Sequence, residues 1–133
     1  MKRDLDLQRK ILLRIEEAKP FETLWDLPIE GYDMQTVAYH CQMLYDAGLI
    51  KEYNGITADN IDGVIDFYVR DLTSAGQDFI ETVRDDTVWA KTKKTIKDKG
   101  LPMLVETAKA VATGFISAVA EGITNSMLKN GGN

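Results

Sequence analysis

Residues 37–50 most constrain what this chain can fold into, because they combine a helical repeat with an abrupt end. Val37, Cys41 and Leu44 recur at the three- and four-residue spacing that places side chains on one side of a helix. Gly48 stands where a helix commonly ends in a left-handed residue, and two apolar residues ending at Ile50 follow it directly. The pattern therefore predicts an amphipathic helix that leads at once into a strand.

The flanking residues predict the rest of a small α+β unit. Asp33 and Thr73 are placed to cap two helices by accepting from early backbone N–H groups. A first helix is expected from Asp4 to about Lys19, and a short strand at residues 25–29. Residues 55–63, rich in Gly, Asn and Asp, read as a loop, and the β-branched and aromatic residues 64–72 read as a returning strand. We expect a mainly helical (α+β) fold.

The run V-A-Y-H-C-Q-M-L-Y-D-A-G-L-I at residues 37–50 resembles the recognition helix and exit turn of bacterial winged-helix repressors. Residues 72–80 are similar to the signature that follows the wing in those repressors. The resemblance implies a winged helix with a two- or three-stranded wing sheet. Residues 20–31 depart from it, because two prolines stand where repressors carry a complete helix before the recognition helix.

A second resemblance covers roughly the first hundred residues. The opening M-K-R-D-L-D-L-Q-R-K-I-L-L and the later R-D-D-T-V-W are similar to a bacterial and prophage family known only as a domain of unknown function, number 2513. This resemblance implies no activity.

The expected domains are a winged-helix domain at residues 1–86 and a helical extension at residues 87–133. Asp85 and Asp86 can cap a lysine-rich helix at residues 88–99, which Gly100 ends. Pro102 suits the first turn of a long amphipathic helix over residues 102–129, about 42 Å long at 1.5 Å per residue.

Three readings of this long helix stay open: packing on the first domain, self-association as a homodimer, and attachment to a membrane surface. Small residues at four-residue steps would let another helix approach closely, at a cost of about 1 kcal/mol for each interior glycine. The chain has no apolar run long enough for a membrane span. The expected dimer interface comprises Ala110, Gly114, Phe115, Ala118 and Gly122.

The winged-helix resemblance implies a DNA-binding transcriptional regulator. Side chains that could read bases or hold phosphates lie on the first helix and on the predicted recognition helix. The net charge of −5 weighs against DNA, because residues 1–70 hold 13 acidic and 8 basic residues. The alternative is a protein-interaction or oligomerisation module that does not bind DNA, favoured if the recognition face is acidic. The DNA-binding candidates are Arg3, Arg9, Lys10, Thr36, Tyr39, His40 and Gln42.

The composition argues against an enzyme. His40 is the single histidine and Cys41 the single cysteine, and adjacent helix residues do not face each other. No glycine-rich phosphate loop is present, so no catalytic residue, metal or cofactor is expected. No secretory signal is evident, which predicts a cytoplasmic protein.

Overall fold

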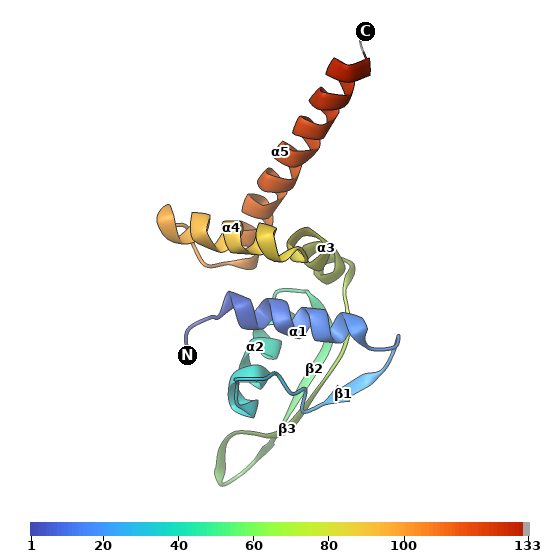
Figure 1. Ribbon diagram of the computed structural model, residues 1–133. Coiled ribbons are helices and arrows are strands. Elements are labelled where there is room, and N and C mark those ends of the chain that lie inside the picture. Colours follow the sequence, from blue (N-terminus) through green and yellow to red (C-terminus); the bar gives the residue numbers. More distant parts are fainter. Residues whose placement is uncertain (132–133) are drawn as a thin grey trace. The chain divides into compact units, whose positions relative to one another are not determined.

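The computed structural model describes residues 1–131, with side chains as far as residue 123. The described chain forms two compact units, Met1–Ile80 and a second that begins at Glu81 (Figure 1). The expected fold class is confirmed: the protein is mainly helical, with a three-stranded antiparallel sheet and a long C-terminal helix. The elements are α1 (Leu5–Glu17), β1 (Thr23–Trp25), α2 (Met34–Asp46), β2 (Ile50–Ala58), β3 (Ile61–Leu72), α3 (Ser74–Val83), α4 (Asp86–Asp98) and α5 (Val105–Gly131).

The core of the first unit lies between the sheet and helices α1 and α2. Both helices and the sheet contribute fully buried side chains, among them Ile11 of α1, Leu44 of α2 and Phe67 of β3. Burying a side chain of this size stabilises a fold by roughly 1.5–3 kcal/mol. The helix ends are fixed by the expected caps: Asp33 Oδ1 accepts from the Thr36 N–H at 2.8 Å. Gly48 has φ +79 after α2, as the helix end requires.

The sheet has the order β1-β3-β2, with β3 in the middle. The predicted loop over residues 55–63 is wrong, because β2 continues to Ala58 and β3 begins at Ile61. Its glycines allow close packing, at Gly55 within the hairpin and at Gly63 against α2. A Cβ at Gly55 would collide with side chains of Val64 and Tyr53, and one at Gly63 with the Gln35 side chain. The glycines in this segment therefore mark places where neighbouring side chains lie close to the backbone, and they do not mark a loop.

The first strand ends earlier than expected, at Trp25 instead of Ile29. Asp26 adopts a left-handed φ of 48° and ends the strand. Its N–H donates to the Phe67 carbonyl at 2.8 Å, and its Oδ1 accepts from the Phe67 N–H at 2.9 Å. Leu27 and Ile29 are nevertheless buried. They are apolar because they pack into the core from a loop, and not because they belong to a strand.

The second unit is a pair of packed helices, α4 and α5. Asp85 caps α4 by accepting from the Val88 N–H at 2.9 Å, and Gly100 (φ +61) follows its end. Ala108 and Ala112 on α5 are completely buried. Further along the helix the large apolar side chains become exposed: Ile116, Val119 and Ile123 are 41%, 61% and 57% accessible. No helix among the described residues is both long and apolar enough to cross a membrane.

Candidate interaction surfaces

Helix α2 presents one stripe of side chains to solvent. Gln35, Tyr39, Gln42 and Asp46 follow one another at four, three and four residues and are all exposed. Tyr39 is 43% accessible. No lysine or arginine occurs anywhere in α2. The exposed surface of this helix is therefore polar and aromatic, and its only formal charge is negative.

The start of α2 is pinned to the β2–β3 hairpin through one glutamine. The Gln35 Nε2 donates to the Val64 carbonyl at 2.6 Å, and Gln35 Oε1 accepts from the Val64 N–H at 2.9 Å. The side-chain amide thus pairs with the strand as another backbone amide would. Asp59 and Asp62, near the hairpin tip, are exposed. We call the outward side chains of α2 together with the hairpin tip the α2–hairpin face.

His40 does not lie on this face, and its expected outward orientation is wrong. The side chain is 1% accessible. Its Nε2 accepts from the Asp4 N–H at 2.9 Å, and its Nδ1 lies 2.8 Å from the Thr36 carbonyl oxygen, to which it donates. These two bonds fit the neutral ring with its proton on Nδ1. His40 therefore joins the start of α1 to α2.

The other DNA-binding candidates are divided between α2 and the N-terminal part of the chain. Tyr39 and Gln42 lie together on the exposed stripe of α2, and Thr36 is half-buried beside it. Arg3, Arg9 and Lys10 belong to the start of the chain and to α1, where Arg3 and Lys10 are exposed and Arg9 is half-buried.

The candidate dimer residues lie on α5. Ala110, Gly114, Ala118 and Gly122 are exposed, and Phe115 is half-buried. A Cβ added at Gly114 or Gly122 would meet no atom within 4 Å. Self-association through this helix stays a prediction.

The outer surface of the sheet carries a group of side chains that the sequence analysis missed. Trp25 stacks at a tilt against Tyr68 across β1 and β3, with ring centroids 5.1 Å apart. Beside them the Arg70 Nε donates to Glu52 Oε2 at 2.9 Å across β3 and β2. Glu52 raises the pKa of Arg70, chiefly through this hydrogen bond. The alternation of apolar and polar side chains along residues 67–70 indicates that Tyr68 and Arg70 share the outer surface. Their partners Trp25 and Glu52 could not be identified without the pairing of the strands.

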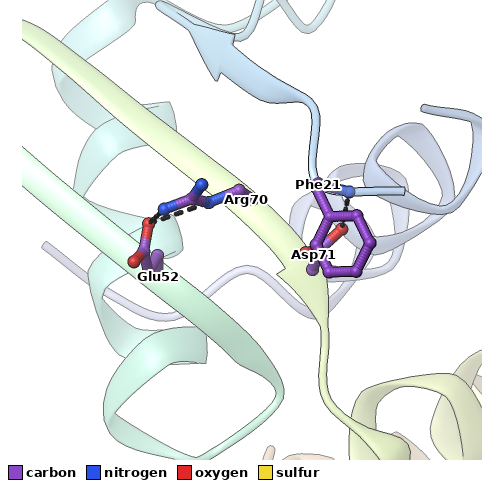
Figure 2. A network of polar contacts seen from close by, with 4 residues as sticks. All are labelled: Phe21, Glu52, Arg70 and Asp71. Atoms are coloured by element: carbon purple, nitrogen blue, oxygen red, sulfur yellow. Dashed lines mark hydrogen bonds and ion pairs between the residues drawn. The ribbon is translucent and has the colours of Figure 1, made fainter. Parts of the chain in front are cut away.

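Phe21 lies near this surface and is unusual in two respects. Its backbone is left-handed, with φ 66, and its side chain is 76% accessible. The Phe21 N–H donates to Asp71 Oδ1 at 3.0 Å, and Asp71 is itself left-handed at φ 54 (Figure 2). Trp, Tyr and Arg are the side chains that protein interfaces favour. The outer sheet surface is therefore a second candidate interface.

Cys41, the single cysteine of the chain, is buried. Burial raises the pKa of the Cys41 thiol to about 12, so its nucleophilic thiolate is scarce at neutral pH. Among the side chains described, those of residues 1–123, no three His, Cys, Asp or Glu gather as a metal site would need.

These features define a small α+β protein with exposed aromatic and acidic surfaces. The chain belongs to the family described as "Hypothetical protein (DUF2513)", whose model matches residues 2–102. This confirms the family expected from the opening residues. A Haemophilus influenzae protein, described as "Uncharacterized protein", is 36% identical over 120 residues, which are 88% of this chain and 97% of the relative. No solved structure matches the chain.

Proposed function

We propose that the first unit is a winged-helix-like protein-interaction module that uses the α2–hairpin face as its contact surface. The observation that carries this proposal is the exposed stripe on α2, in which Tyr39, Gln42 and Asp46 offer an aromatic ring, an amide and a carboxylate but no cation. The winged-helix reading is supported by the succession of α2 and an antiparallel hairpin in a sheet of order β1-β3-β2.

Charge favours a protein partner over nucleic acid. Binding to DNA draws most of its nonspecific affinity from cations that neutralise phosphates. Met1–Ile80 holds 15 acidic and 8 basic residues, and exposed Asp46, Asp59 and Asp62 belong to the α2–hairpin face itself. Phosphates brought to this face would meet like charge. Tyrosine, in contrast, supplies a large contact area with few rotatable bonds and is enriched at protein interfaces.

Site-specific photocrosslinking tests the proposal. A photoreactive phenylalanine derivative is placed at Tyr39 in cells that produce the protein naturally, and a matched one at exposed Lys19, outside the face. We expect a discrete adduct from position 39 that protease removes and nuclease does not, and no such adduct from position 19. An adduct sensitive to nuclease, or the same adducts from both positions, would contradict the proposal.

A DNA-binding transcriptional regulator is the second candidate. It is favoured by the exposed pair Tyr39 and Gln42, which could contact bases or backbone, and by exposed Arg3 and Lys10, which could hold phosphates. For this candidate, Gln42→Ala would lower affinity for a selected operator while leaving nonspecific binding unchanged.

A further inference from the structure

The connection between β1 and α2 forms an open groove with α1. Residues 26–33 contain no helix, and they run beside α1. The groove has a volume of about 430 Å³. Its apolar part is provided by Leu13, Pro28 and Ile29, and its charged part by Lys10, Arg14 and Glu30.

Both ends of the connection are fixed by hydrogen bonds. At its start Asp26 exchanges two hydrogen bonds with Phe67 of β3. Near its end the Tyr32 hydroxyl donates to Asp4 Oδ2 at 2.9 Å. The Lys10 ammonium lies 5.6 Å from the centre of the Tyr32 ring. The groove wall is therefore ordered before anything binds, which reduces the entropy that binding costs.

Two cations line the α1 side of the groove within a unit whose net charge is negative. Lys10 and Arg14 are one helical turn apart, so their charges repel each other weakly. Arg14 pairs with Glu17 at 3.0 Å, but both side chains are largely exposed, and such pairs contribute little. A carboxylate placed between Lys10 and Arg14 would relieve the repulsion without displacing a buried contact.

We propose that this groove binds an acidic amphipathic helix of a partner protein. The apolar side chains of that helix contact Leu13, Pro28 and Ile29, and its carboxylates pair with Lys10 and Arg14. Residues 10 and 14 lie four apart on one ridge of α1, with Leu13 beside it, and a second helix can pack along such a ridge. A nucleic-acid backbone would use the two cations but leave the apolar part of the groove uncovered. The inference rests on the proposed function, since it gives the interaction module a partner class and a second contact surface.

The test uses the full chain, isotopically labelled, and two synthetic helical peptides followed through backbone amide shifts. Both peptides carry the same leucine stripe; one has glutamates beside the stripe and the other has lysines. We expect the glutamate peptide to shift the amides of Leu13, Ile29 and Glu30 saturably, and to bind about tenfold or more tightly than the lysine peptide. Equal affinities, or shifts confined to other residues, would overturn the proposal.

Charge-reversal variants test whether the acidic peptide binds through Lys10 and Arg14. We expect Lys10→Glu with Arg14→Glu to weaken binding of the glutamate peptide about tenfold or more. Lys19→Glu with Lys51→Glu changes the net charge equally at exposed positions outside the groove and should leave binding nearly unchanged. Equal weakening by both pairs would overturn the proposal, as would a duplex DNA that shifts the same amides at lower concentration. If the peptides fail to bind as expected but position 39 still crosslinks to a protein, only the groove proposal is rejected. If the adduct at position 39 is sensitive to nuclease, the proposed function is rejected.

Discussion

Helix α2 is held at both ends and along one side by specific contacts, whereas the described part of α5, as far as Ile123, is covered only near its beginning. Asp33 caps the start of α2, Gly48 allows its exit, and Gln35 fastens it to β3. On α5 only Ala108 and Ala112 are completely buried among the described side chains. Apolar periodicity predicted both helices equally well. The difference shows that apolar periodicity predicts that a helix has an apolar face. It does not predict what covers that face, because the covering residues lie elsewhere in the chain.

The largest effect is expected from truncating buried and exposed aliphatic side chains in the two helices. Leu44→Ala should lower the free energy of unfolding by about 2–5 kcal/mol, because it leaves a cavity in the core. Ile123→Ala should cost less than about 0.5 kcal/mol, because that side chain is 57% accessible. Urea denaturation of both variants measures the contrast. Comparable losses would break the comparison and show that α5 is covered along its length.

The next effect concerns His40 and its neighbour. His40→Ala should cost about 2–3 kcal/mol, because the Asp4 N–H loses its acceptor and the ring leaves a void. Tyr39→Ala, one residue away but exposed, should cost under about 0.5 kcal/mol. Thermal denaturation compares the two. If Tyr39→Ala proved as costly as His40→Ala, the assignment of Tyr39 to the exposed surface and of His40 to the core would fail.

Glycine substitutions give effects of opposite sign just after α2 and within α5. Gly48→Ala should cost about 1 kcal/mol, because φ is +79 at that position. Gly114→Ala should instead stabilise α5 by up to about 1 kcal/mol, because the added Cβ meets no atom within 4 Å. Helicity and stability can be followed by circular dichroism. Destabilisation by Gly114→Ala would reveal a helix packed closely there, as the predicted homodimer requires.

The smallest effect is a pH dependence at the start of α2. Hydrogen bonds from Thr36 hold the pKa of Asp33 below its ordinary value of 3.8. Because the folded pKa is the lower one, the carboxylate stabilises the fold above pH 3.8, and this contribution fades as the pH falls through the folded pKa. Asp33→Ala should therefore be less stable than the natural protein at pH 7, and the gap should narrow in acid. Urea midpoints at several pH values measure it; a constant gap would contradict the role of the charge.

The features that were predictable from sequence are local ones. The caps Asp33, Thr73 and Asp85 each accept from an N–H three residues ahead, so their roles follow from short spacing. The outward orientation expected for His40 was wrong, because its Asp4 partner is 36 residues away in the sequence. For the same reason the Trp25–Tyr68 pair and the α1 groove escaped prediction: both need the register of β1 against β3 and the path of residues 26–33.

Titration of labelled duplex DNA with the full chain tests the central claim that the α2–hairpin face recognises protein. Fluorescence anisotropy is measured near 50 mM salt, roughly where phosphate contacts are strongest in ordinary assays. The account predicts no saturable binding by the natural protein and no difference for Tyr39→Ala. Saturable binding that weakens steeply with added salt and is lost in Tyr39→Ala would contradict it.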